Sequence, residues 1–126
     1  MRLKKAVYYE SENAQRPVEE FLNSLNNKTK AKILARIDFL EEHWHELRRP
    51  YIDIIEDGLW ELRIQFARSK VRVIYAYMFR DYIILLHGFF KTTGSIPQAD
   101  KLAARKRMLD FQRQYDAGIL KLKTIE

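Results

Sequence analysis

The sequence predicts an α+β fold, in which a small, mostly antiparallel sheet carries a helical hairpin on one face. Three patterns indicate this class. Apolar and polar side chains alternate from Trp60 to Phe66, with the period of two expected of a strand with one buried face. Residues 71–79 and 82–90 are rich in β-branched and aromatic side chains, and segments of helical periodicity precede and follow the strands. The expected order of elements is therefore β-α-α-β-β-β-α.

The N-terminal third supplies one strand and the helical hairpin. Residues 4–9 are a short β-prone run. A helix is expected to open at Pro17, because proline is tolerated in the first turn and the following glutamates favour the positive end of the helix dipole. A second helix, capped by Asn26-Asn27, is expected over residues 28–45. Its apolar side chains recur at helical spacing and would cover the sheet: Ile33, Ile37, Leu40 and Trp44.

The remaining elements follow the same logic. Residues 47–57 read as a loop with a short extended piece at 52–55, closed by the turn signal Asp57-Gly58. After the linker 92–94, Ser95 to Gln98 fits a capping box, and a last helix is expected to end near Tyr115. We expect one domain over residues 1–115 and a tail over 116–126, with 119–126 as a loose tail or strand.

The expected turns fix the strand register. Turns at residues 67–70 and at Arg80-Asp81 would place Phe66 opposite Val71 and Phe79 opposite Tyr82. One sheet face would then be apolar, formed by Trp60, Leu62, Ile64, Phe66, Val71, Val73, Tyr75, Tyr77, Ile84, Leu86 and Phe90. The other face would have an apolar end, covered by the last helix or by a partner, formed by Ala76, Met78, Ile83 and Leu85.

Cationic side chains gather at the other end of that second face. Strand spacings of about 4.8 Å and same-face repeats of about 7 Å put Arg63, Arg72, His87 and Lys91 within roughly 10–15 Å, enough to hold one or two phosphates. Gln65 and Phe89 lie among them, and an aromatic ring beside cations suits base stacking. The alternative is an ordinary solvated surface, with His87 a hydrogen-bonded structural histidine.

Composition narrows the function classes. The chain has 126 residues and a formal net charge of +6, which favours a polyanionic partner such as nucleic acid. The absence of cysteine excludes disulfides and thiolate chemistry, and His43 and His45 have no third ligand at a convincing spacing, so neither metal nor cofactor is expected. No P-loop or G-x-S-x-G motif occurs. Lacking a signal-peptide pattern and a membrane-length apolar run, the chain is expected in the cytoplasm.

The core strands carry recognisable motifs. GLWELRI, RVIYAY and LLHGFFKTTGSIP together resemble the HigB-like, phage-derived branch of the RelE/ParE toxin superfamily, over roughly residues 4–115. The resemblance implies a RelE-like fold, mRNA cleavage on the translating ribosome, and inhibition by an antitoxin from an adjacent gene, expected to be a helix-turn-helix protein. By position, Arg63, Arg72 and Lys91 match the family's cationic residues. Thr92 replaces a usual second lysine, and Pro97 lies near a functional tyrosine of RelE, so the acid and base roles do not carry over.

These residues suggest a metal-independent endoribonuclease. Arg63 and Arg72 stay protonated and are expected to bind the phosphate, with Lys91 as a third cation or proton donor. His87 is the candidate general acid or base, and Glu61 is a weaker one that could simply pair with a cation. Further RNA contacts are expected from Arg68, Lys70, Gln65 and Phe89.

Two alternatives remain open from the sequence. A ParE-like inhibitor of DNA gyrase shares the same scaffold, and fold alone does not choose between the two toxins. A non-catalytic nucleic-acid-binding module would use the same basic surface, with salt-sensitive binding and no strand cleavage.

Overall fold

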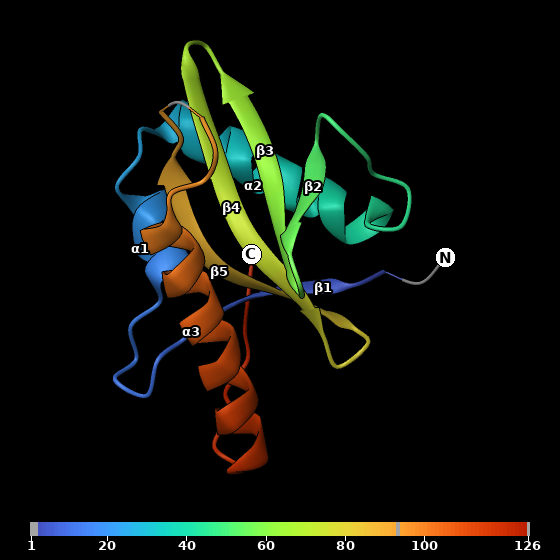
Figure 1. Ribbon diagram of the computed structural model, residues 1–126, viewed down its shortest axis with the longest axis vertical. Coiled ribbons are helices and arrows are strands. Elements are labelled where there is room, and N and C mark those ends of the chain that lie inside the picture. The colour runs from blue at the N-terminus through green and yellow to red at the C-terminus, as the bar shows by residue number, and fades with distance from the viewer. Residues whose placement is uncertain (1–2, 93, 126) are drawn as a thin grey trace.

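An open six-stranded sheet lies between the helical hairpin and the last helix in the computed structural model, which describes residues 3–92 and 94–125 (Figure 1). The strand order is β2-β3-β4-β5-β1-β6, in which β1 pairs parallel with β5 and the other pairs are antiparallel. The elements are β1 (Lys5–Tyr8), α1 (Pro17–Asn23), α2 (Asn27–His43), β2 (Ile52–Glu56), β3 (Leu59–Phe66), β4 (Ser69–Met78), β5 (Tyr82–Phe90), α3 (Gln98–Asp116) and β6 (Lys123–Thr124).

This architecture confirms the predicted α+β class and adds two edge strands. The extended piece expected at 52–55 is β2, which pairs with β3, and the C-terminal segment forms β6 beside β1. The predicted capping box is wrong: α3 begins at Gln98, and its N-cap is Pro97, which has no side-chain oxygen to offer. Thr93 in the expected linker and Glu126 at the end of the expected tail lie outside the described residues.

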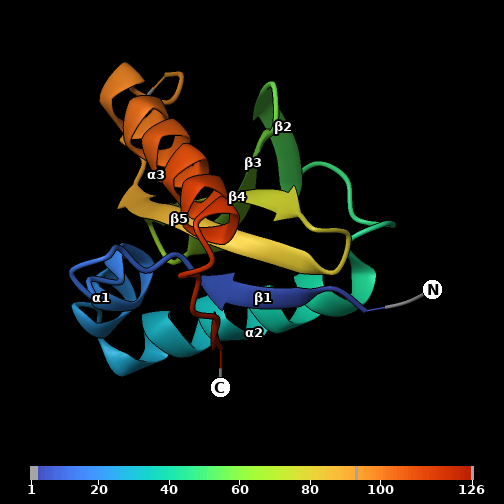
Figure 2. The same ribbon diagram turned by 90° about the horizontal axis from the view of Figure 1, so that it is seen from below.

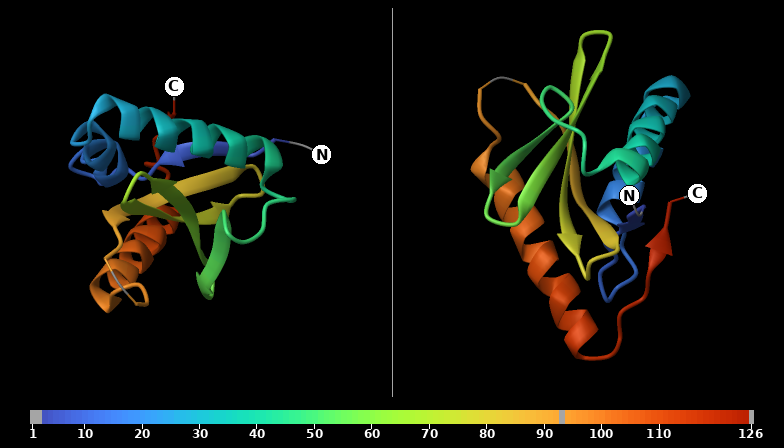
Figure 3. Two further views of the ribbon diagram at one scale, coloured as in Figure 1. Left: turned by 90° about the horizontal axis from the view of Figure 1, so that it is seen from above. Right: turned by 90° about the vertical axis from the view of Figure 1, so that its right-hand side faces the viewer.

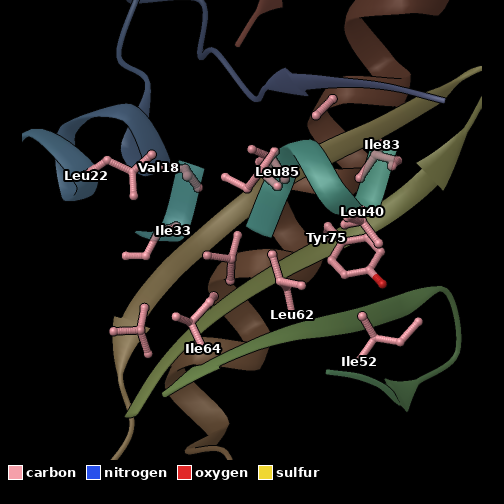
Figure 4. Close-up of a cluster of buried hydrophobic side chains, with 14 of the residues drawn as sticks. Val18, Leu22, Ile33, Leu40, Ile52, Leu62, Ile64, Tyr75, Ile83 and Leu85 are labelled. Atoms are coloured by element: carbon pink, nitrogen blue, oxygen red, sulfur yellow. The ribbon is translucent and has the colours of Figure 1, made fainter. Parts of the chain in front are cut away.

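The helical hairpin covers one sheet face. Pro17 occupies the first turn of α1, and the side chain of Asn26 caps α2 by accepting a hydrogen bond from the Thr29 amide at 2.9 Å. Figure 2 shows α2 running beside β1 on this face. Between the hairpin and the sheet, Figure 4 shows buried side chains from both of these layers, including Val18, Leu22, Ile33, Leu40, Leu62, Ile64, Tyr75, Ile83 and Leu85.

The register of the first hairpin differs from the predicted one by two residues. Phe66 pairs with Ser69 rather than Val71, because Ala67 and Arg68 alone make the turn, with Ala67 at a φ of 54°. A shift of two residues preserves which side chain lies on which face, since the side-chain period of a strand is also two. Its effect is to bring Arg63 directly opposite Arg72.

The second hairpin departs by one residue, which reverses part of β5. Tyr82 pairs with Met78 rather than Phe79, because Phe79 and Arg80 both take left-handed φ values, 52° and 66°. The predicted faces of four residues are therefore wrong: Ile83 and Leu85 pack under the helical hairpin, whereas Ile84 and Leu86 face α3. An irregularity in the pairing beside Ile74 restores the predicted register beyond it.

Helix α3 covers the second face, as Figure 3 shows from above and from the side. Ala104 and Phe111 on α3 are fully or almost fully buried against apolar side chains of the sheet, chiefly Ile74, Ala76, Ile84 and Leu86. The apolar end of that face is thus filled by the chain's own last helix. The end that carries Arg63 lies beside the first turns of α3, because Arg63 and Lys101 of α3 line the same pocket.

Gly88 of β5 lies close to the ring of Phe21 on α1. A Cβ atom at Gly88 would lie 2.5 Å from Cδ2 of Phe21, a distance that real contacts essentially never show. We expect Gly88→Ala to lower the free energy of unfolding by about 1–3 kcal/mol through overpacking, measured by urea denaturation. Adding Phe21→Leu should recover part of the loss, because it removes the clashing ring atoms. Equal stability of Gly88→Ala and the parent chain would contradict this packing.

Candidate active site

Glu61 lies between two arginines on the α3 side of the sheet. Arg63 and Arg72 are direct partners across β3 and β4. One oxygen of Glu61 lies 3.2 Å from Nη2 of Arg63, and the other lies 3.1 Å from Nε of Arg72. Like charges directly opposite each other destabilise a strand pair, so the carboxylate offsets a repulsion that the register creates.

The two arginines differ in their access to solvent. The side chains of Arg72 and Glu61 are 10% and 8% exposed, whereas that of Arg63 is 30% exposed. Burial lowers the pKa of the Arg72 guanidinium below its usual value, and the Glu61 carboxylate opposes that change. Arg72 also donates from Nη1 to the Val71 carbonyl at 3.1 Å. Arg72 is therefore an internal partner of Glu61, and Arg63 is the more accessible of the two arginines.

A second carboxylate reaches Arg63 from the edge strand. Oδ2 of Asp53 lies 3.3 Å from Nη2 of Arg63 and 2.8 Å from Nη2 of Arg49. The hydrogen bond from Arg49 is the main reason that the pKa of Asp53 lies below its usual value. Two carboxylates, of Glu61 and Asp53, thus pair with three guanidinium groups, so the cluster keeps a net positive charge. The Nε of Arg63 is buried and has no hydrogen-bond partner among the described residues.

A surface pocket of about 260 Å³ opens beside this cluster. Three cationic side chains and one carboxylate contribute to its wall: Arg63, Lys91, Lys101 and Glu61. Lys91 follows the end of β5, and its amide donates to the Lys70 carbonyl at 2.8 Å, which ties the chain to the tip of the first hairpin. The predicted convergence of Arg63 with Lys91 is therefore present in the geometry. An anion is the ligand that such a wall suits.

Sequence reasoning missed Lys101 as a member of this group. The residue lies in the first turns of α3, where the sequence shows only a generally basic helix side. Its presence in the pocket depends on how α3 docks on the sheet, and no local motif reports that docking. Asp53 was missed for the same reason, because β2 brings it to Arg63 across the sheet.

His87 makes a hydrogen bond through each ring nitrogen. Nε2 lies 2.6 Å from Oδ1 of Asp100, and Nδ1 lies 2.9 Å from Nη1 of Arg107. Arginine is only a donor, so Nδ1 accepts, and the ring proton on Nε2 is donated to Asp100. Both partners belong to α3. This geometry favours the structural alternative, in which His87 fastens β5 to α3.

The other predicted RNA contacts separate into two groups. Arg68 and Lys70 are exposed at the tip of the first hairpin, where the Gln65 side chain donates to the Ala67 carbonyl at 3.0 Å. Phe89 instead stacks on His87, with ring centroids 5.5 Å apart. The hairpin tip is open to a ligand, whereas Phe89 belongs with the contacts that hold α3.

Residues 3–92 and 94–125 contain neither a candidate metal site nor a helix that could cross a membrane. No group of three or more histidine, cysteine or acidic side chains there is arranged to hold a metal ion. None of the described helices has the length and apolar character needed to cross a membrane.

Comparison of the sequence with known protein families assigns the chain to one of them. Residues 20–109 match the family model described as phage derived protein Gp49-like (DUF891), which covers well over half of the chain. The chain belongs to this Gp49-like family. The family is part of the RelE/HigB-like toxins and is associated with toxin-antitoxin systems, which implies an antitoxin partner. No curated protein matches the sequence significantly. The matched segment includes Glu61, Arg63, Arg72, Lys91 and Lys101.

The buried ion pair of this Gp49-like protein can be tested by substitution. Glu61→Gln removes the counter-charge of the buried Arg72, and we expect the free energy of unfolding to fall by about 3 kcal/mol in urea denaturation. The matched control is Glu56→Gln, which breaks a surface ion pair with Arg105 and should cost less than about 1 kcal/mol. Similar losses in the two variants would show that the Glu61 carboxylate does not balance a buried charge.

Proposed function

We propose that this Gp49-like protein is the toxin of a type II toxin-antitoxin system of the HigB-like branch, and that it cleaves mRNA on the ribosome. The observation that carries the proposal is the cationic pocket in which Arg63, Lys91 and Lys101 meet beside Glu61. Family membership supports the toxin role, and the pocket supports an anionic substrate such as an RNA phosphodiester.

The proposed reaction is attack of a ribose 2′-hydroxyl on the adjacent phosphate. In the attack, O2′ loses its proton to solvent water and forms a bond to phosphorus, and the bond to the departing 5′-oxygen breaks as that oxygen takes up a proton. Arg63 and Lys101 are suited to bind the phosphate oxygens as negative charge grows on them. Lys91 is suited to act as a third cation or as the donor of the proton. Arg72, being buried, is a positioning residue that acts through Glu61.

The two candidate proton acceptors, Glu61 and His87, are both engaged by other side chains. This supports a cleavage reaction that depends on the ribosome. Glu61 already faces two guanidinium groups, and both His87 nitrogens are engaged by α3. A site without an uncommitted base gains most from alignment of the O2′ nucleophile with the phosphate. Such alignment contributes up to roughly 7–11 kcal/mol in well-oriented reactions, and the ribosome-bound mRNA would supply it.

Arg63→Ala is expected to reduce cleavage of ribosome-bound mRNA on the order of 100-fold, because it removes one preorganised charge from the phosphate site. The measurement is the cleavage rate in a reconstituted translation reaction. The control is Arg113→Ala, which removes an arginine paired with Glu12 and Asp110 near the other end of α3 and should leave the rate unchanged. Full activity of Arg63→Ala would reject the site. Induction of DNA damage without mRNA cleavage in cells would instead favour a gyrase inhibitor.

His87→Ala separates the two roles of that histidine. The structural role predicts a lower melting temperature, because the variant loses the contacts of His87 with Asp100 and Arg107. It also predicts a cleavage rate within a few-fold of the parent when both are assayed well below melting. A loss of about 100-fold with unchanged melting would assign the imidazole to general acid-base catalysis instead.

A further inference from the structure

A second hollow, next to the cationic pocket, lies where the end of α2 approaches the edge strand β2. This aromatic groove has a volume of about 710 Å³. Its wall combines aromatic, aliphatic and basic side chains: Trp44, His45, Leu47, Arg48, Arg49, Ile52, Asp53, Ile54, Trp60 and Tyr77. Neither the phosphate-binding residues nor α3 takes part in it, so the proposed ribonuclease chemistry leaves the groove unexplained.

Three large rings form the floor of the aromatic groove. The ring centroids of Trp44 and Trp60 lie 5.9 and 5.6 Å from that of Tyr77. Each ring is partly buried, so the floor packs against the rest of the protein yet remains reachable. Tryptophan, tyrosine and arginine are the residue types that most often dominate binding energy at protein interfaces, and this groove carries all three. An apolar side chain from a partner would be desolvated on such a floor.

The edge strand β2 beside the groove has few free backbone donors. A partner is therefore not expected to bind there by adding a strand to the sheet. The Ile54 amide donates to Oδ1 of Asp53 at 3.0 Å, and the Ile52 amide donates to the Arg48 carbonyl at 3.3 Å. The pairing of β2 with β3 is also irregular between Ile54 and Glu56. With these donors engaged, an added strand would gain few backbone hydrogen bonds. A partner must bind through its side chains, as an amphipathic helix does in a groove.

The rim of the aromatic groove is cationic. Arg48 is exposed and donates only to carbonyl oxygens, those of His45 and Leu47, and it makes no ion pair within the part of the chain described. Arg49 is paired with Asp53, but its side chain is 75% exposed. Beside the lining residues, Nζ of Lys4 lies 4.3 Å from the Trp44 ring centroid. Together with the net charge of +6, this rim complements an acidic partner.

We propose, building on the toxin function proposed above, that the aromatic groove is the docking site of the antitoxin, which inserts one face of an acidic amphipathic helix. A bulky apolar side chain of that helix fills the floor between Trp44, Trp60 and Tyr77, and a carboxylate pairs with Arg48. The helix then lies beside Asp53, whose other arginine contact is Arg63 of the cationic pocket. Bound there, the antitoxin shields the edge of the sheet from which RNA reaches the pocket.

The test is the dissociation constant of the purified chain for the protein encoded by the adjacent gene, measured by isothermal titration calorimetry. Arg48→Glu reverses the rim charge at an exposed position, and Trp60→Leu trims the aromatic floor while keeping an apolar side chain. Each is expected to weaken binding at least tenfold. The matched control is Lys106→Glu, an identical charge reversal on the exposed side of α3, which should change the constant less than twofold.

Unchanged binding by Arg48→Glu, or weaker binding by Lys106→Glu alone, would overturn the proposal and move the partner to α3. Failure of the parent chain to bind the adjacent-gene protein would overturn it as well. A melting curve for each variant shows whether Trp60→Leu remains folded, and Arg48→Glu decides the matter if it does not. Cleavage by the free parent chain is assayed in parallel. Groove-dependent binding without any mRNA cleavage would sustain the docking site and reject the ribonuclease function.

Discussion

The candidate site depends on a carboxylate held between two guanidinium groups in the sheet. The β3–β4 register sets Arg63 directly against Arg72, an arrangement that a strand pair tolerates only with a counter-charge. Glu61 supplies that charge, and it draws both arginines toward one point of the face. The partial exposure of Arg63 then follows from its place on β3 next to the edge strand. A buried ion pair and the partly exposed cation to which we assign phosphate binding are thus parts of one cluster.

Much of this arrangement could be predicted from the sequence, because a period of two determines the face of each strand residue. Arg63, Arg72 and Lys91 were expected to converge, and the two-residue shift in the first hairpin left their faces unchanged. The reversal of residues 83–86 was not predictable in the same way. It requires left-handed conformations at Phe79 and Arg80, where the sequence offers none of the usual glycine or asparagine, and an irregularity beside Ile74 that compensates for it.

The contacts between α3 and the sheet also could not be predicted from the sequence. Helical periodicity indicated a basic last helix, but it did not indicate which turn would meet which strand. The docking brings Lys101 to the cationic pocket, and Asp100 and Arg107 to His87. It thereby engages both ring nitrogens of His87, for which the sequence left a catalytic and a structural role open, and this geometry favours the structural one. Side chains from distant parts of the chain define the site, so only the three-dimensional arrangement distinguishes these roles.

The edge strand β2 separates two surfaces of different chemistry, a cationic pocket suited to a phosphate and an aromatic groove suited to a protein helix. Asp53 joins them through its pairing with Arg49 and Arg63. The central claim is that the cationic pocket promotes attack by the 2′-hydroxyl of RNA. The most direct measurement is the chemistry of the ends in mRNA cleaved on ribosomes by the purified protein. The expected ends are a 2′,3′-cyclic phosphate and a 5′-hydroxyl; 5′-phosphate ends, or mRNA left intact on translating ribosomes, would contradict the claim.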